Sequence, residues 1–320
     1  MFDNRGRRVG KTEYVASAPD SLDLPRKTLF RQLSLKVDGI VDITDVTQVP
    51  VLYTGAIGAG LKLVPRVEII ANGRDTIKSI SADALAMKNL YLYGTKPALT
   101  EPGLTVAAHP FGGVFMVPFA MPRSIREIDT LLPSGRLSTL ELKVTYGSAD
   151  AMFSTLPTAH TITKCDVVVH LNESMRLDGK DEPYSSFKEL YIEKTVTAAS
   201  AAFQVILPVG NRYRGFLIEC ESDGNMVNTI LNKISIKSGT DVFFSKDADV
   251  VQGENPIMLN LGAQTVTGYY YVDFCPEGRL VDALDATKLS SLEMELDVNV
   301  PGTIDKIRIY PCEIIAGAVI

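Results

Sequence analysis

Leu137-Ser138-Thr139-Leu140-Glu141-Leu142 is followed 152 residues later by Leu289-Ser290-Ser291-Leu292-Glu293-Met294. Four further pairs of segments match in the same order along the chain: residues 30–36 with 187–193, the turns at 72–73 and 223–224, residues 113–119 with 268–274, and residues 162–164 with 304–306. Short apolar patterns recur by chance, but five matches in one order indicate an internal duplication. We therefore predict two copies of one domain of about 150 residues, which lies in the size range of a single β-sandwich.

The pattern within each copy is that of β-strands. Residues 140–144 read Leu-Glu-Leu-Lys-Val, an alternation of apolar and charged residues that has the period of a strand. Runs such as 167–169 and 216–218 are continuously apolar, as expected for strands in the core of a sandwich. Turn signals such as Asp38-Gly39 and Pro301-Gly302 separate the segments.

Helices are expected only in short segments, at residues 82–93, after Ser124 and near Leu280. Many short strands with regular turns and little helix are typical of sandwiches rather than of βαβ units. The fold is therefore predicted to be all-β: two tandem eight-stranded jelly-roll β-sandwiches related by internal duplication, with short helices in the crossings.

The prediction divides the chain into a basic N-terminal arm at residues 1–27, a first jelly roll at 28–171, a polar linker at 172–186 and a second jelly roll at 187–320. The arm carries four cations within its first eleven residues, namely Arg5, Arg7, Arg8 and Lys11. It has too little apolar surface to fold alone, so we expect a tail that extends from the domain. Each cation near an anionic lipid surface would contribute roughly 1 kcal/mol, so these residues are candidates for contact with a membrane or a neighbouring chain.

Composition excludes several classes of function. The chain has 320 residues, 46% of them hydrophobic, which is enough for two cores. A formal net charge of −6 argues against a protein that coats nucleic acid, because phosphate binding needs a basic face. No apolar run approaches the ~18 residues of a membrane-spanning helix, and no signal-peptide pattern opens the chain. The four cysteines have neither metal-ligand nor disulfide-scaffold spacing, so they are predicted to be reduced, mostly buried thiols of a protein that folds in a cytoplasm: Cys165, Cys220, Cys275 and Cys312.

Motifs that would carry catalytic chemistry are not found. Gly10-Lys11-Thr12 resembles the end of a phosphate-binding loop, but Arg5 stands where that loop needs its first glycine. The three histidines, at positions 109, 160 and 170, show no His-x-His spacing, so a metal site of the cupin type is not predicted. We therefore expect neither an enzyme nor a bound cofactor.

The Tyr269-Tyr270-Tyr271 run has the composition of a stacking platform for sugars or bases. Successive residues of a strand point to opposite sides, so Tyr270 faces away from Tyr269 and Tyr271. The three rings cannot form one surface, and packing in the core and at an interface is the predicted role.

The tandem copies, the strand-rich pattern and the basic arm together resemble the double jelly-roll major capsid proteins of membrane-containing icosahedral viruses, the tectivirus and adenovirus lineage. The resemblance is architectural and covers roughly residues 28–320. Details that look similar are the two Leu-Ser-[Thr/Ser]-Leu-Glu strands and the two Gly-x-x-x-Val-x-Phe strands, at 113–119 and 268–274. The family carries no catalytic residues, so none is assigned here.

The resemblance implies a structural subunit of a bacterial or archaeal virus, located in the capsid shell of the virion. It implies a homotrimer that forms a pseudo-hexagonal capsomer, with neighbouring capsomers, penton or minor capsid proteins and an internal viral membrane as partners, and no specific nucleic acid. A phage spike or carbohydrate-binding module remains an alternative, since jelly rolls also host lectins. Stoichiometric metal in the purified protein would instead favour a metal-dependent double-sandwich enzyme.

Overall fold

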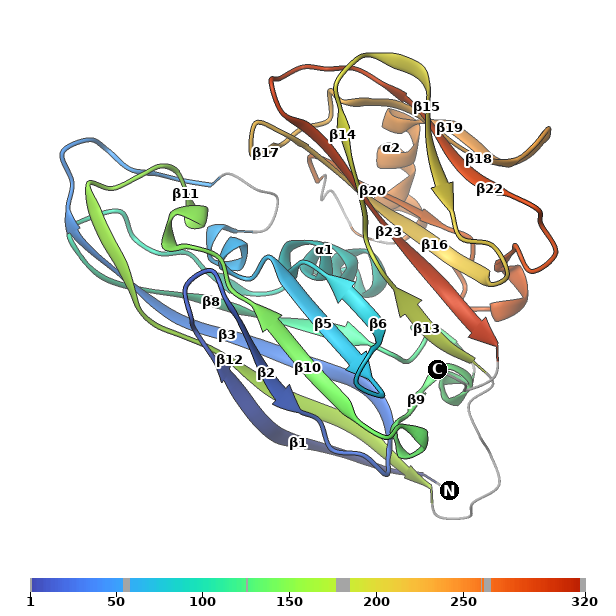
Figure 1. Ribbon diagram of the computed structural model, residues 1–320, viewed down its shortest axis with the longest axis horizontal. Coiled ribbons are helices and arrows are strands. Elements are labelled where there is room, and N and C mark those ends of the chain that lie inside the picture. Colours follow the sequence, from blue (N-terminus) through green and yellow to red (C-terminus); the bar gives the residue numbers. More distant parts are fainter. Residues whose placement is uncertain are drawn as a thin grey trace.

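The computed structural model describes residues 2–53, 58–124, 126–176, 185–259, 261 and 266–316. Figure 1 shows two strand-rich bodies, the first coloured from blue to green and the second from yellow to red, with α1 (Ala82–Tyr93) between them. Both termini lie near the same end of the molecule (Figure 1).

The first body consists of two four-stranded layers. One layer has the order β1 (Phe2–Glu13), β12 (Ala159–Arg176), β3 (Leu29–Asp45) and β8 (Ala107–Pro118), and the other has the order β6 (Asp75–Ile80), β5 (Arg66–Ala71), β10 (Leu140–Thr145) and β2 (Pro19–Asp23). Neighbouring strands within these layers are antiparallel. The eight main strands of this body can be renumbered 1 to 8 in chain order, as β1, β2, β3, β5, β6, β8, β10 and β12. With these numbers the layers read 1-8-3-6 and 5-4-7-2, which is the connectivity of a jelly roll.

The second body repeats this connectivity. Its first layer has the order β13 (Ser185–Glu189) with β14 (Ile192–Val196), β23 (Asp305–Ala316), β16 (Arg212–Ser222) and β20 (Tyr269–Asp273), and its second has the order β15 (Ser200–Leu207), β22 (Leu292–Val298), β18 (Leu231–Ser238) and β19 (Asp241–Asp247). β13 and β14 together form the first strand, since both pair with β23. The predicted fold class, two tandem jelly rolls, is confirmed.

Short elements complete the two bodies. The minor strands are β4 (Val51–Leu52), β7 (Leu99–Thr100), β9 (Leu132–Pro133), β11 (Phe153–Thr155), β17 (Asn225–Met226) and β21 (Leu284–Asp285). The 3-10 turns are η1 (Ala59–Leu63), η2 (Glu127–Thr130), η3 (Ser134–Arg136), η4 (Ala149–Met152) and η5 (Leu280–Asp282). None of the helices in the described ranges is long and apolar enough to cross a membrane.

Three of the five matched pairs of segments occupy equivalent strands. Residues 137–142 and 289–294 lead into β10 and β22, residues 113–119 and 268–274 lie along β8 and β20, and residues 162–164 and 304–306 lie in or beside β12 and β23. The other two matches are wrong, because their segments belong to strands that are not equivalent. Residues 30–36 belong to β3 whereas 187–193 span β13 and β14, and the turn at 72–73 follows β5 whereas that at 223–224 follows β16. Short apolar alternation is common to all strands, so it matched strands that are not equivalent.

The helix predicted at residues 82–93 is confirmed as α1. Ser81 caps it by accepting a hydrogen bond from the Ala84 N–H at 3.0 Å, and Gly94 ends it with a φ of 77°. α2 (Ala248–Met258) occupies the equivalent crossing of the second jelly roll. The helices expected after Ser124 and near Leu280 are single 3-10 turns, η2 and η5.

The prediction of an N-terminal arm is wrong. β1 pairs with β12 from Phe2 opposite Arg176 to Glu13 opposite Asp166, and β2 pairs with β10. The segment lacks apolar residues of its own, but the sheets supply hydrogen-bond partners along its length, and Thr12 is buried with its hydroxyl 2.7 Å from that of Tyr146. The first jelly roll therefore begins at β1 rather than at residue 28.

The predicted linker at 172–186 also needs correction at its ends. Residues 172–176 belong to β12, and residues 185–186 belong to β13. Residues 177–184 lie outside the described residues. The end of the last strand of the first jelly roll and the start of the first strand of the second are therefore separated by eight residues.

The two jelly rolls share one continuous sheet. β6 pairs in parallel with β13, with Lys78 opposite Glu189, and this contact joins a layer of each jelly roll into an 11-stranded sheet. α1 packs against β8 of the first jelly roll and β16 of the second, and its residues from Ala82 to Leu92 are all buried. We call this region, where β6 and α1 meet β13, β16 and β23, the joint.

Candidate functional site

The four cations predicted as a contact site lie on β1, and the structure does not bring them onto one surface. Arg8 and Lys11 stand opposite His170 and Val168, on the outer side of the sheet. Arg5 and Arg7 stand opposite Glu173 and Leu171, on the other side. An alternating strand therefore divides the cluster between two faces.

Ion pairs neutralise two of these cations. Arg7 Nε lies 2.8 Å from Glu173 Oε1, and the Thr28 hydroxyl donates to Glu173 Oε2 at 2.6 Å. Burial alone would raise the pKa of Glu173, but hydrogen bonds from Arg7 and Thr28 hold it below its ordinary value. Lys11 Nζ lies 2.7 Å from Glu13 and 3.3 Å from Asp166. These contacts attach β1 to β12 and form part of the fold.

β1 is the edge strand of its layer: it pairs with β12 on one side, and no strand of the described residues pairs with it on the other. An edge strand presents unpaired backbone N–H and C=O groups, and charged side chains on it limit unwanted pairing. The basic residues that were predicted to mark a flexible tail thus have the positions of edge-protecting charges.

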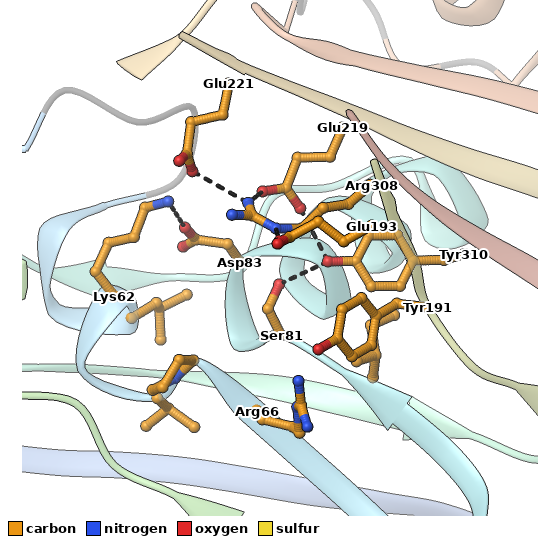
Figure 2. A pocket seen from close by; sticks show the side chains of 14 residues that line it. Lys62, Arg66, Ser81, Asp83, Tyr191, Glu193, Glu219, Glu221, Arg308 and Tyr310 are labelled. Carbon is orange, nitrogen blue, oxygen red and sulfur yellow. Dashed lines mark hydrogen bonds and ion pairs between the residues drawn. The ribbon is translucent and has the colours of Figure 1, made fainter. Parts of the chain in front are cut away.

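The joint contains a polar cavity of about 300 Å³, shown in Figure 2. Both jelly rolls contribute: Lys62 and Arg66 precede or lie in β5 and Asp83 lies in α1, while Glu219 and Arg308 lie in β16 and β23. Because the two bodies meet here along strand and helix rather than through a flexible linker, the cavity has a fixed wall from each.

Arg308 is the centre of an ionic network in this cavity. Its guanidinium lies 2.6 Å from Glu219, 3.1 Å from Glu221 and 2.6 Å from Glu193, as Figure 2 shows. The Tyr310 hydroxyl donates to the second oxygen of Glu219 at 3.0 Å. Burial would lower the pKa of Arg308, but Glu219 and Glu221 raise it above its ordinary value, so the cation persists at every relevant pH.

Glu219 and Glu221 respond differently to the same arginine. The Glu219 side chain is only 2% exposed. This burial raises the pKa of Glu219, although Arg308 opposes the shift. Glu221 is more accessible; burial would raise its pKa too, but Arg308 holds that pKa below the ordinary value. Within this network, Glu221 is therefore the carboxylate whose low pKa depends directly on Arg308.

A second pair faces the same cavity. Lys62 Nζ lies 2.9 Å from Asp83 Oδ2 and 4.1 Å from the centre of the Tyr53 ring. Burial would lower the pKa of Lys62, but Asp83, Tyr53 and Glu219 raise it above its ordinary value. The other oxygen of Asp83 is buried without a hydrogen-bond partner among the described residues. Arg66 stacks on the Tyr191 ring at 4.6 Å, so that aromatic face is already covered.

A third charged cluster lies at the parallel pairing of β6 and β13. Glu189 contacts Lys88 through one oxygen and Lys78 through the other, the latter at 2.5 Å. All three side chains are at most 5% exposed. Arg214 and Asp273, 3.6 Å apart and equally buried, belong to the same interior region.

The tyrosine run behaves as predicted. Tyr269 and Tyr271 belong to the core that faces the first jelly roll, and Tyr270 belongs to the separate core of the second. Tyr271 stacks on Tyr91 of α1 with ring centres 5.2 Å apart, and the Tyr91 hydroxyl donates to the Tyr269 carbonyl at 3.3 Å. The run therefore packs the joint on one side and the second core on the other.

The cysteines and histidines of the described ranges, which are the candidate reactive side chains, are not gathered at one site. All four cysteines are buried and unpaired, as predicted, and burial raises the pKa of Cys165 and of Cys275 to about 12. His109 contacts the Thr105 carbonyl, and His160 lies 3.0 Å from Asp150. Over the described residues, no group of three His, Cys, Asp or Glu side chains is arranged to hold a metal ion.

Comparison with solved structures identifies the fold. The major capsid protein of Sulfolobus turreted icosahedral virus aligns over 99% of this chain and 98% of its own, with a TM-score of 0.76 and 15% identity. The major capsid protein of bacteriophage PM2 aligns over 98% of both chains, with a TM-score of 0.65 and 12% identity. The capsid protein of the PBCV-1 virus aligns over 98% of this chain and 94% of its own, at 0.64 and 12%.

This chain has the double jelly-roll fold of these capsid proteins. No family model matches the sequence. No curated protein matches it either. The identities are below those at which residue-by-residue roles carry over, so the double jelly roll is established here by its shape and connectivity.

Sequence reasoning missed the charged clusters of the joint. Lys78, Lys88 and Glu189 are common residue types in unremarkable positions, and strand pairing between the two bodies brings them together. One signal was available: α1 is nearly apolar around its whole circumference, as a helix buried on all sides is. Once α1 is taken as fully buried, Asp83 and Lys88 must have partners of opposite charge.

Proposed function

We propose that this protein is the major capsid protein of an icosahedral virus, a structural subunit of the virion shell. The observation that carries the proposal is the double jelly roll itself, which matches several major capsid proteins over nearly the whole of both chains. The ion pairs of the joint fit this structural role, because they link the two jelly rolls and the elements beside them to one another.

We further propose that the capsomer is a homotrimer. Two similar but non-identical sandwiches per chain give a trimer six roughly equivalent wedges, which suits a hexagonal lattice. The charges of the two bodies differ in sign: residues 2–176 contain 20 Lys and Arg against 17 Asp and Glu, whereas residues 185–320 contain 11 against 18. Head-to-tail closure places the basic first jelly roll of one chain against the acidic second jelly roll of the next.

Light scattering on the purified protein tests the trimer. The expected mass is about three times 34.8 kDa, and electron microscopy of the concentrated protein is expected to show hexagonal outlines or shells. A stable monomer at micromolar concentration, with no larger species in either measurement, would contradict the proposal. Glycan binding by an isolated oligomer would favour the spike or lectin alternative instead.

The contact role of Arg5, Arg7, Arg8 and Lys11 is proposed at β1 rather than at a tail. β1 is an exposed basic edge, and the neighbouring second jelly roll in a head-to-tail trimer is acidic, so we assign these residues to the contact with a neighbouring chain. The charge reversal R8E is expected to weaken the trimer. K36E, on the same outer side but two strands inward, is the matched control.

Two results would contradict this assignment. One is an R8E trimer that is as stable against dilution and salt as the K36E trimer. The other is co-flotation with vesicles of anionic lipid that R8E abolishes while trimer stability stays unchanged, since that would assign β1 to a membrane.

A further inference from the structure

The pairing that joins the two jelly rolls leaves two equivalent strands without partners. Within the chain, the fifth strand of the first jelly roll, β6, pairs in parallel with the first strand of the second, β13. The equivalent strands are β19 in the second jelly roll and β1 in the first. Over the described residues, β19 pairs with β18 alone and β1 with β12 alone, so each has an open edge of backbone N–H and C=O groups. Figure 1 shows β1 and β19 at opposite ends of the molecule, so the two edges cannot meet within one chain.

α2 lacks the cover that its equivalent, α1, has. Both jelly rolls pack against α1, whose residues from Ala82 to Leu92 are all buried. α2 follows β19 directly and packs on strands of its own jelly roll. Two of its apolar side chains are exposed, Ile257 by 82% and Met258 by 61%. Exposed apolar side chains on a helix beside an open strand edge are typical of a surface that another chain covers.

The two open edges carry opposite charge. β19 and α2, residues 241–258, contain four Asp and Glu against one Lys. β1, residues 2–13, contains four Arg and Lys against two Asp and Glu. The pairing within the chain also joins opposite charges, since Lys78 of β6 contacts Glu189 of β13. Charge complementarity therefore favours β1 of a second copy as the partner of β19 and α2.

We propose that β19 pairs in parallel with β1 of a neighbouring copy, and that this copy covers α2, so that the contact between chains repeats the joint within each chain. This inference rests on the proposed homotrimer and names the surface that β1 contacts. In a trimer, six jelly rolls would meet at three joints within chains and three between them. A head-to-tail contact closes into a ring when its rotation fits, and one repeated joint gives all six contacts a similar rotation.

The pairing of β6 with β13 predicts the register between chains. Lys78 stands opposite Glu189, three residues before Ser81, which caps α1. On β19, the residue three positions before Asp247, the N-cap of α2, is Phe244. Phe244 is therefore the equivalent of Lys78.

On the side of β1, the same comparison leads to Arg8. Glu189 pairs with Cys312 of β23. The sequence match between β12 and β23 makes His170 the counterpart of Cys312, and Arg8 pairs with His170. Arg8 is therefore the equivalent of Glu189.

Chemical cross-linking tests this register. With Phe244 opposite Arg8 of the next chain in a parallel pair, Lys246 lies beside Lys11 of that chain. Both lysine side chains are accessible to a lysine-specific reagent, at 40% and 39% exposed. A short cross-linker is expected to convert the full-length wild-type protein into dimers and trimers on a denaturing gel and to give a peptide pair that joins Lys11 to Lys246. K246R should lose this pair, whereas the matched control K237R, on neighbouring β18, should keep it.

The stability of the trimer is the second measurement. V242K adds a cation to β19, where it would face the basic strand β1, and I206K adds the same cation to β15, the other edge strand of the layer. Val242 is 60% exposed and Ile206 is 80% exposed, so both variants are expected to fold. V242K should raise the concentration at which the trimer dissociates by roughly tenfold or more, and I206K should leave it unchanged.

A wild-type trimer that gives no link between Lys11 and Lys246 would overturn this contact and leave the trimer intact. So would a V242K trimer that is as stable as the I206K trimer. A wild-type protein that stays monomeric would overturn the trimer and this contact together, so the two failures are distinguishable. Because the cross-linking uses the wild-type chain, failure of V242K to fold would not protect the inference.

Discussion

Replacement of Arg308 by methionine is the sharpest test of the ionic network in the joint. R308M keeps much of the length and apolar stem of the side chain but removes the guanidinium that contacts Glu193, Glu219 and Glu221. Glu193 and Glu221 have access to solvent, but Glu219 does not. The substitution therefore leaves one carboxylate buried without its cation.

The magnitude follows from this burial. Removal of one partner from a buried ion pair typically costs 3–5 kcal/mol, and Arg308 is partly exposed, so we expect a loss of about 3 kcal/mol in the free energy of unfolding at pH 8. The pKa of Glu219 is already raised by burial and rises further without Arg308. A carboxyl group with a raised pKa in the folded state stabilises the protein at low pH and loses that contribution as the pH rises from about 4.3 through the folded pKa. The loss in R308M should therefore shrink by roughly 1–2 kcal/mol at pH 5.

Urea unfolding followed by tyrosine fluorescence suits this chain, which has 12 Tyr and no Trp. The double variant R308M/E219Q removes the stranded charge and is expected to regain most of the stability at pH 8 while losing the pH dependence. K237M, which breaks a more accessible pair with Glu295, is the matched control and should cost far less than R308M. A loss in R308M that is below about 1 kcal/mol, or is equal at pH 5 and pH 8, would refute the reasoning.

Three further predictions concern the core, the first strand and the cysteines. Y271A removes the ring stacked on Tyr91 and should destabilise the protein by about 3–5 kcal/mol in urea, whereas a surface role for Tyr271 would leave stability unchanged. Deletion of residues 2–13 removes β1 and exposes the edge of β12, so size-exclusion chromatography should show aggregation; a deletion variant that elutes as the wild type does would return these residues to the role of a tail. Thiol titration should find no reactive cysteine in the folded protein and four in unreduced denatured protein, and a count of two or zero after denaturation would show disulfides.

The sequence predicted the fold class because strand alternation broken by turn signals runs through both halves of the chain. It matched residues 113–119 and 137–142 to segments in equivalent strands, and in the second of these pairs the pattern of buried and exposed side chains is also nearly the same in both copies. It misplaced residues 30–36, because apolar alternation alone does not distinguish the third strand from the first. Order along the chain is therefore weaker evidence than the identity of particular buried residues.

β1 shows why composition fails for an edge strand. Arg5, Arg7, Arg8 and Lys11 give residues 2–13 the composition of a disordered tail, yet the hydrogen bonds that order this segment come from β12. A long-range partner cannot be inferred from the segment itself. The structure also gives Gly10 a packing role that its sequence context does not reveal, because a side chain there would meet Leu22 of β2 at 2.7 Å.

The charged clusters of the joint need an explanation other than stability. A buried ion pair is often no more stabilising than a well-packed apolar pair, so apolar residues could hold two sandwiches together at least as strongly. Apolar surfaces, however, slide over one another at little cost, whereas Lys78 and Lys88 find Glu189 in one register only. We infer that the network around Arg308 and the cluster around Glu189 fix the angle between the two jelly rolls, which the closed lattice proposed above requires. R308M/E219Q separates the two roles at the Arg308 network: in assembly of the proposed shell it should regain stability yet form shells of mixed size, and uniform shells from this variant would show that the Arg308 network does not set the angle.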